Sequence, residues 1–295
     1  MKEQIEFRKI REFGDIIGDT FVFIKQNFKP LLKAFLTLCG VFILGGILSS
    51  LFMQLNLFSN NGTINIASSY SSGWGRLYNL GVSYIFMVVF MMLNYTSMYI
   101  AVLSYISIYI QKGNQQPSVA EVWAYFKYYF FRVLGSSLLI GIFFVVCLIC
   151  CLIPGIYVFP AITLFFPIMI MENGNFSHAF SRSFALVKNE WWITAATLMV
   201  IYIIFYAFSF VVQLPAYIIL MISAFSGAEG MITRSYAVAA AVGQQAAQVF
   251  LIIPIVCAAL CYYNLVERKE SSGLMGRIDG FGQANNQDNS SPEEY

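Results

Sequence analysis

Charged side chains are scarce in this chain of 295 residues, because only 11% of them are Asp, Glu, Lys or Arg. Soluble domains typically use about 25%, so this scarcity excludes a water-facing surface on a protein of this size. Five long windows carry no charge at all: residues 34–75, 77–111, 133–171, 191–228 and 235–266. A helix needs about 20 apolar residues to cross the hydrocarbon core of a bilayer. The sequence therefore predicts an all-α, multi-pass integral membrane protein.

Residues and motifs that usually carry chemistry are also missing. The single histidine, His178, cannot form a histidine metal site, and no phosphate loop, dinucleotide fingerprint or nucleophile elbow is present. A net charge of +2 is too small to indicate a nucleic-acid partner. Cys147, Cys150 and Cys151 are spaced like metal ligands, but in an apolar window we interpret them as helix-packing residues. We expect no catalytic residues, no cofactor, no metal and no soluble catalytic domain.

The sequence does contain one motif that occurs three times. In each copy a lysine stands among aromatic residues just before an apolar window. The three copies are FVFIKQNFKPL from Phe21, WAYFKYYFFRV from Trp123 and FALVKNEWWIT from Phe184. When they are aligned on Lys25, Lys127 and Lys188, apolar residues recur with the spacing i, i+4, i+7, i+11. The sets are Ile17, Phe21, Ile24 and Phe28; Val119, Trp123, Phe126 and Phe130; and Phe180, Phe184, Val187 and Trp191.

This spacing is one face of an α-helix. Each helix is too short and too polar to span the bilayer. We therefore expect it to lie in the headgroup plane with its apolar face toward the membrane. The lysine then sits at the edge of the apolar stripe, where its ammonium reaches water or phosphate. The chain is expected to turn after each surface helix and enter the bilayer.

The expected unit is one surface helix followed by a two-helix hairpin, used three times. The ranges are an N-terminal segment 1–12, repeats over 13–112, 117–173 and 176–267, and a disordered tail 270–295. Six spans are predicted near Leu31–Phe52, Tyr78–Ile110, Val133–Leu152, Gly155–Met171, Trp191–Leu214 and Tyr236–Val266. The stretch LIPGIY predicts a tight turn between the third and fourth spans. Proline predicts irregularity in the fourth span, at Pro160 and Pro167, and kinks at Pro215 and Pro254. The loop 56–74 is interpreted as an outside spacer or lid.

The distribution of positive charge predicts the orientation. Only Arg76 and Arg234, of the 17 Lys and Arg residues, lie on the side opposite to the others when six spans are drawn. This bias predicts that both termini are cytoplasmic. A seventh span, made by splitting the fifth at Pro215, would place the cations after the last span outside, so six is the better number.

Two groups of polar residues are candidate sites. Glu172, His178, Arg182 and Lys188 surround the third surface helix, and with Lys25 and Lys127 they form a candidate set of interfacial, headgroup-binding residues. The simpler interpretation is capping and salt pairing. The second group is Gln213, Gln244, Gln245 and Gln248. Amides beside small residues commonly hold membrane helices together, and the alternative is a hydrated, uncharged path between the fifth and sixth spans.

Three stretches resemble a known family. They are IPGIYVFPAITLFFPIMIMEN (residues 153–173), AFSRSFALVKNEWW (residues 179–192) and CYYNLVERKE (residues 261–270). Together they resemble the glycerophosphodiester phosphodiesterase membrane domain and related uncharacterised bacterial six-span proteins. Asn264 stands where that family usually has an aspartate. The soluble hydrolase barrel of the fused enzymes has no counterpart in this chain, so the resemblance implies a six-span module of the bacterial inner membrane without hydrolase activity.

These features favour a non-enzymatic protein that scaffolds or assists a membrane or lipid-related process, with the lipid bilayer and other membrane proteins as partners. The alternative is a permease, or a lipid or small-molecule transporter, with its uncharged path between repeats. An intramembrane enzyme ranks third, because such enzymes usually need ionisable residues at depth.

Overall fold

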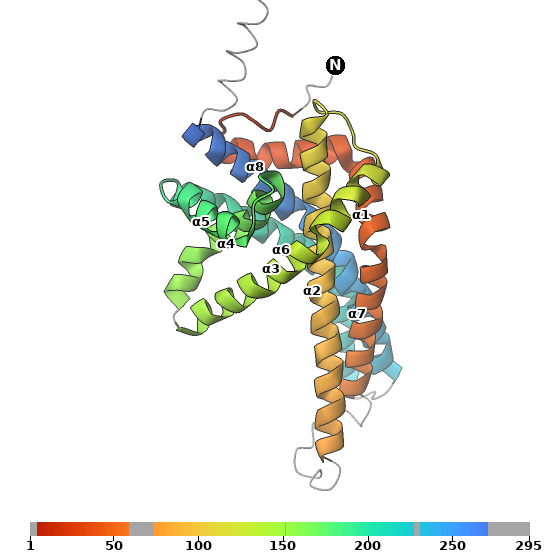
Figure 1. The fold of residues 1–295 in the computed structure, drawn as a ribbon. Helices are drawn as coiled ribbons and strands as arrows, with labels where there is room; N and C mark the ends of the chain where they lie inside the picture. Colours follow the sequence, from red (N-terminus) through yellow and green to blue (C-terminus); the bar gives the residue numbers. More distant parts are fainter. Residues whose placement is uncertain (1–4, 59–72, 151, 227–230, 271–295) are drawn as a thin grey trace, which may run out of the picture.

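The protein is a bundle of helices, shown in Figure 1 as a computed structural model. The structure describes residues 5–58, 73–150, 152–226 and 231–270. The elements in these ranges are α1 (Phe13–Phe58), α2 (Gly73–Gln111), α3 (Val119–Cys150), α4 (Leu152–Met171), α5 (Phe176–Val187), α6 (Trp191–Ser226), α7 (Met231–Gln248), a short 3₁₀ helix (Val249–Leu251) and α8 (Ile252–Glu270). Six helical stretches of this part of the chain are long and apolar enough to cross a membrane. A multi-pass helical membrane protein is therefore the architecture.

Helix α8 is the centre of the bundle. Its residues from Ile255 to Leu260 are fully buried, and α8 packs on α1, α2, α4, α5 and α6. A helix that is hydrophobic all round belongs in an interior, and this stretch, IVCAAL, has no polar face to give to water. Helices α1, α2, α4 and α6 surround α8, so their outward faces are the ones left for lipid.

The first surface segment is continuous with the first span. Figure 1 shows α1 as a red segment lying across one end of the bundle, followed by a segment that runs along it. Pro30 lies inside this helix, and a proline in a helix interior removes a hydrogen bond and bends the helix. Helix α3 likewise has no break between its first turns and its apolar part. A separate surface helix, as predicted, occurs only in the third case, where α5 ends at Val187 and α6 begins at Trp191.

The protein-facing side of the first surface segment is not the predicted apolar stripe. In α1 the predicted Phe21 and Phe28 are exposed by 37% and 54%. The residues one position before Phe21, Ile24 and Phe28 are instead buried: Thr20, Phe23 and Asn27. In α5 the buried residues are Ala179, Ser183, Leu186 and Val187. A surface helix on a membrane protein must satisfy two apolar environments. In α1 the predicted stripe is the outer one, whereas Phe126 of α3 and Val187 of α5 belong to the predicted stripes and are buried.

The predicted turn at LIPGIY is wrong, because these six residues form the first turns of α4. Helix α3 ends at Cys150 and α4 begins at Leu152, so the stretch lies inside α4. Pro154 is tolerated there because the first N–H groups of a helix have no acceptor within it. Gly155 then allows close packing of the hairpin, since a Cβ at this position would lie 2.4 Å from Leu148 Cδ2. Helix α4 runs without a break through Pro160 and Pro167, so the expected irregular span is not seen.

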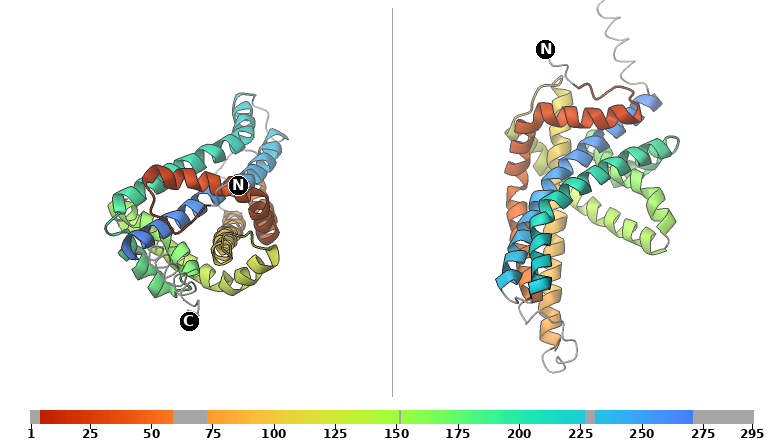
Figure 2. Two further views of the ribbon diagram at one scale, coloured as in Figure 1. Left: turned by 90° about the horizontal axis from the view of Figure 1, so that it is seen from above. Right: turned by 180° about the vertical axis from the view of Figure 1, so that it is seen from behind.

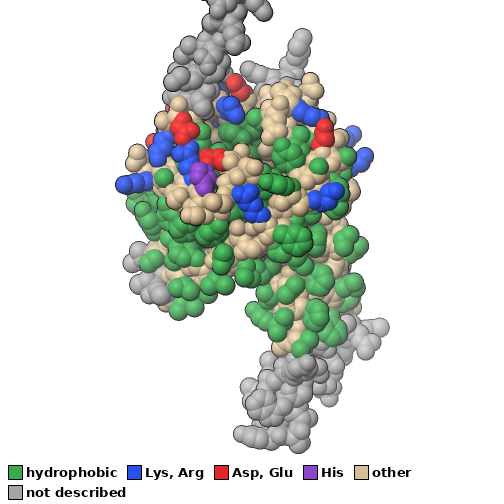
Figure 3. All heavy atoms as spheres, in the orientation of Figure 1, with side chains coloured by type: hydrophobic (Ala, Val, Ile, Leu, Met, Phe, Trp, Pro, Cys, Tyr) green, Lys and Arg blue, Asp and Glu red, His purple; other side chains and the backbone are tan. Residues whose placement is uncertain are grey.

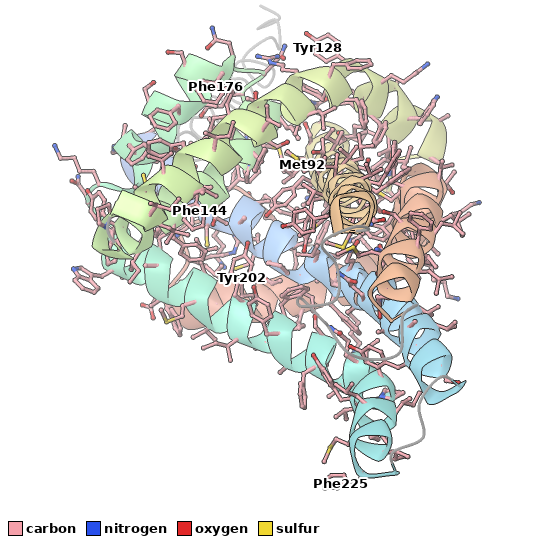
Figure 4. The ribbon with its side chains drawn as sticks, turned by 90° about the horizontal axis from the view of Figure 1, so that it is seen from below. Met92, Tyr128, Phe144, Phe176, Tyr202 and Phe225 are labelled. Carbon is pink, nitrogen blue, oxygen red and sulfur yellow. The ribbon has the colours of Figure 1, made fainter. Side chains whose placement is uncertain are left out.

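The six-span arrangement is found in place of the seven-span one. Helix α6 continues through Pro215 as one element, and Figure 4 shows it changing direction before it reaches Phe225. The predicted kink before Pro254 is confirmed, because the 3₁₀ turn Val249–Leu251 separates α7 from α8. Proline cannot donate to the carbonyl four residues earlier, and that missing bond favours a break at this place.

Among the described side chains in the view of Figure 3, the charged ones gather at one end of the molecule, above a broad hydrophobic band. Figure 2 shows that the described chain starts and finishes at this same end. We call it the charged end. The predicted outside loop 56–74 and the tail 270–295 lie almost wholly outside the described residues, so those two predictions stay untested.

Candidate functional site

The connection from α4 to α5 builds the first part of the site. Asn173 has a left-handed backbone, with φ of 49°, a conformation that asparagine tolerates better than most residues. Arg132 of α3 holds it by donating to the Asn173 side-chain oxygen at 2.9 Å and to its backbone carbonyl at 3.2 Å. Asn175 then caps α5 by accepting from the backbone N–H of His178 at 2.9 Å. This tight turn brings the start of α5 back over Glu172.

Glu172 is the hub of what we call the charged network: Glu172, His178, Arg182, Tyr262 and Glu270. His178 Nε2 lies 2.6 Å from Glu172 Oε2, while Arg182 Nε and the Tyr262 hydroxyl donate to Oε1 at 3.2 and 3.0 Å. Arg182 also pairs with Glu270 at the end of α8. An ionised carboxylate can only accept, so His178 carries a proton on Nε2 in this arrangement. The network ties α4, α5 and α8 together.

The environment of this network favours its charged state. Burial raises the pKa of the Glu172 carboxyl, but hydrogen bonds from His178 and Tyr262 and the charge of Arg182 outweigh it and hold the pKa below its ordinary value of 4.5. Burial lowers the pKa of Arg182, whereas its bonds to Glu270 and Glu172 raise it above the ordinary value overall. Both residues are therefore ionised at neutral pH, as a charge-assisted contact requires.

An N-terminal strap, residues 5–12, forms the second part of the charged end. Phe7 is buried, with edge-to-face contacts to Phe23 and Tyr263. Arg11 is also buried, and its Nε donates to Asp19 at 2.7 Å. The Arg11 backbone N–H donates to Asn264 Oδ1 at 2.8 Å, a bond that an aspartate at 264 could equally accept. The strap thus crosses the end of the bundle and is fixed to α1 and α8.

The same end of α8 continues this set of contacts. Arg268 donates to the backbone carbonyl of Arg11 at 3.0 Å and to Glu190 Oε1 at 3.4 Å. Lys269 donates to the carbonyl of Ala185 in α5. Nothing in the local sequence predicts these partners, because each pair joins residues about 80 or more positions apart.

The predicted interfacial residues fall into two kinds. Glu172, His178 and Arg182 come together, as the simpler interpretation of salt pairing required. Lys25, Lys127 and Lys188 are exposed and take part in none of the ion pairs found among residues 5–58, 73–150, 152–226 and 231–270. Lys127 lies over the ring of Trp123 of its own helix, 5.8 Å from the ring centroid.

The predicted amide group is only partly brought together. Asn94 of α2 donates to Gln245 Oε1 at 2.8 Å and also to Gln248 Oε1. Ser50 of α1 donates to Gln244 Oε1 at 3.2 Å. We call Ser50, Asn94, Gln244, Gln245 and Gln248 the amide network. Its bonds run from α7 to α1 and α2 rather than to the fifth span.

Gln213 of α6 lies apart from this network. Its backbone and Cγ approach Gly243, where an added Cβ would lie 3.8 Å from the Gln213 Cγ. No hydrogen bond joins Gln213 to the three α7 glutamines in the described structure. Sequence reasoning grouped these residues by type, but the 3.6-residue period of α7 turns Gly243 toward α6 and the bonded amides toward α1 and α2.

Chemically, the charged end is an arrangement of acceptors and donors that satisfy one another. Both oxygens of Glu172 are occupied, and within the described residues no group of three or more His, Cys, Asp and Glu side chains is placed to hold a metal ion. Cys147 is a half-buried free thiol in α3; the side chains of Cys150 and Cys151 lie outside the described residues. No family model, no curated protein and no solved structure matches this chain. The resemblance to the glycerophosphodiester phosphodiesterase membrane domain stays a prediction.

Proposed function

We propose that this chain is a non-enzymatic scaffold of the bacterial inner membrane that assists a membrane or lipid-related process. In this proposal its three surface segments bind anionic lipid headgroups. The carrying observation is the division of its cations. Arg11, Arg182 and Arg268 are engaged in bonds that hold the fold together, whereas Lys25, Lys127 and Lys188 are exposed and lie outside those ion pairs. Lysines left over at a membrane interface suit the phosphates of anionic lipids, at about 1 kcal/mol each.

Burial at equivalent positions supports the three-repeat arrangement that this proposal needs. Five residues before each lysine stand Thr20, Val122 and Ser183, and all three are buried. Six residues after each lysine stand Leu31, Val133 and Thr194, and these are buried as well. The three surface segments thus turn the same face inward relative to their lysines, so the lysines point outward in the same way. The charge bias of the sequence supports a cytoplasmic location for this end and for both termini.

The test measures lipid selectivity with the full-length chain in vesicles of phosphatidylcholine containing spin-labelled phosphatidylglycerol or spin-labelled phosphatidylcholine. The triple variant Lys25→Gln/Lys127→Gln/Lys188→Gln should lose most of the preference for the anionic lipid. A control of equal charge change is Lys9→Gln/Lys112→Gln/Lys269→Gln, which should keep it. Equal loss in both variants would show only a general charge effect, and no loss in the first would refute headgroup binding.

Affinity purification from native membranes should return stable membrane-protein partners, and their absence would count against a scaffold.

A transporter is the second candidate, and one observation favours it. Asn94 Oδ1 and Ser49 Oγ are buried polar atoms without a hydrogen-bond partner, and such atoms commonly bind internal water. A chain of water beside the amide network would make an uncharged path. Saturable solute flux in reconstituted vesicles, abolished by Gln244→Leu or Gln248→Leu, would favour transport over scaffolding.

A further inference from the structure

The α3–α4 hairpin leaves the bundle at an angle and leaves a hollow beside it. Figure 1 shows that its tip ends well before the far end of α2. In Figure 3 the surface is indented between this hairpin and the column that contains α2, and the side chains around the indentation are hydrophobic. Since α2, α3 and α4 are candidate spans, the hollow lies at the depth of the lipid chains.

Three helices supply the walls of the hollow. Seen from below in Figure 4, Met92 of α2, Phe144 of α3 and Tyr202 of α6 lie around one central space. All three side chains are half-buried. Helices α2 and α6 are not extensively packed on one another, and both pack instead on α4 and α8. The space between them is therefore walled by side chains that have only part of their surface covered by protein.

Hydroxyl groups gather at the inner end of this space. Tyr99 of α2 and Tyr202 of α6 pack on the same face of α4, against Phe166 and Phe159, and Thr163 lies between these two phenylalanines on that face. The ring of Tyr99 packs on Phe166, with centroids 4.9 Å apart, and the ring of Tyr202 on Phe159 at 5.5 Å. Three helices thus meet at a small polar spot that is surrounded by aromatic rings.

No Asp, Glu, Lys, Arg or His occurs in residues 77–111, 133–171 or 191–226, the stretches that supply these walls. A phosphate or ammonium group would find no counter-charge here, and an unpaired charge is costly in an apolar setting. A hydroxyl or ester carbonyl, by contrast, can exchange hydrogen bonds with the tyrosines at little cost. The chemistry of the hollow therefore selects an uncharged polar group attached to long hydrocarbon chains.

We infer that the hollow between α2, α3 and α6 is a binding site for an uncharged, hydroxyl-bearing membrane lipid of the diacylglycerol class. Its hydroxyl and ester groups bond to Tyr99 and Tyr202, and its acyl chains lie along Met92 and Phe144. The opening faces the hydrocarbon layer, so such a lipid enters sideways from the bilayer. This site is independent of the surface lysines, and the two can fail separately.

The test is photolabelling of the full-length chain in phosphatidylcholine vesicles, with diacylglycerol or phosphatidylcholine carrying the same photoreactive acyl chain at equal mole fraction. Labelled residues are mapped by mass spectrometry. Diacylglycerol should label the walls around Met92 and Phe144 about fivefold more than phosphatidylcholine does, the ratio expected from one hydrogen bond. Equal labelling by the two lipids would mean that bulk acyl chains fill the hollow and would overturn the inference.

The matched variants remove hydroxyls without changing shape. Tyr99→Phe/Tyr202→Phe should reduce diacylglycerol labelling to the phosphatidylcholine level. Tyr84→Phe, at an exposed tyrosine of α2, should leave the preference unchanged. Thermal stability in detergent confirms that each variant is folded. A preference that survives in the folded double variant would contradict the role of the two tyrosines.

Discussion

The charged network and the amide network solve the same problem at two depths of one membrane protein. At the charged end, Glu172 contacts an imidazole, a guanidinium and a phenol, and Glu172, His178 and Arg182 are partly exposed to water, whereas Tyr262 is buried. Deeper in the bundle, Asn94 donates hydrogen bonds to two glutamines, Gln245 and Gln248, and none of these three residues carries a charge. A charged side chain is stable only where solvent helps to stabilise it. Deeper in the bundle, neutral amides therefore make the hydrogen bonds that join the helices.

The sharpest way to break this comparison is to place a charge in the amide network. Asn94→Asp removes the amide donor and sets a carboxylate against the oxygens of Gln245 and Gln248. We expect the free energy of unfolding to fall by about 3 kcal/mol or more. Asn94→Leu, which removes the donor without adding charge, should cost less. Unfolding in mixed micelles measures both, and an aspartate tolerated within about 0.5 kcal/mol would show that water already fills this region.

Removing the hub of the charged network should have a smaller and more local effect. Glu172→Ala leaves Arg182 and Tyr262 without their shared acceptor, at a cost of about 1–2 kcal/mol, because the site is partly exposed. The loss should appear as roughly tenfold faster amide hydrogen exchange in α5. Lys188→Gln, at the end of the same helix, is the control and should leave exchange unchanged. Protection of α5 that survives Glu172→Ala would show that apolar packing alone holds this helix.

Lowering the pH should weaken the contacts of Glu172 in the unmutated protein. The pKa of Glu172 is lower in the folded protein than its ordinary value of 4.5, so the folded state binds fewer protons than the unfolded state near that pH. The contribution of Glu172 is therefore complete above pH 4.5 and is lost as the pH falls through the folded pKa. Exchange in α5 should accelerate across this window. In Glu172→Gln, which cannot titrate at this position, the pH dependence should flatten.

The smallest effect tests the closeness of packing around the amides. A Cβ on Gly46 of α1 would lie 2.6 Å from Gln245 Nε2, so Gly46→Ala must displace that amide, at about 1 kcal/mol. Gly40→Ala on the same helix is the matched control, because an added Cβ there meets nothing within 4 Å. Equal stability of the two variants in a mixed-micelle titration would mean that Gln245 moves aside freely.

Much of the architecture could be predicted because the bilayer constrains it strongly. Windows without charge located the six spans, and Pro254 located the break between α7 and α8. Local rules failed where a residue had two permitted roles. Pro154 signals a turn in sequence, yet the first turn of a helix accepts it equally well. Likewise, the outward stripe that contains Phe21 and the inward face that contains Phe23 have the same helical period. The period alone therefore did not identify which face contacts the protein.

The candidate site was predictable only in its local half. His178 and Arg182 stand six and ten residues after Glu172, and a turn followed by a helix brings all three together. Tyr262 stands 90 residues away from Glu172, and its approach depends on how α8 packs. The strap was missed for the same reason. Its charged sequence predicts a solvated segment, and Phe7 is buried only because α1, α2 and α8 provide a pocket for it.

The strap also sets an order on biosynthesis. Its anchors, Tyr263, Asn264 and Arg268, leave the ribosome more than 250 residues after Phe7 does. The contacts of the strap with Phe23, Asp19 and Tyr109 can form earlier, but its contacts with α8 must wait for that helix. Only a polypeptide in which α8 has been inserted can make the full set of strap contacts, so the fully bound strap distinguishes chains that contain α8 from chains that stop before it.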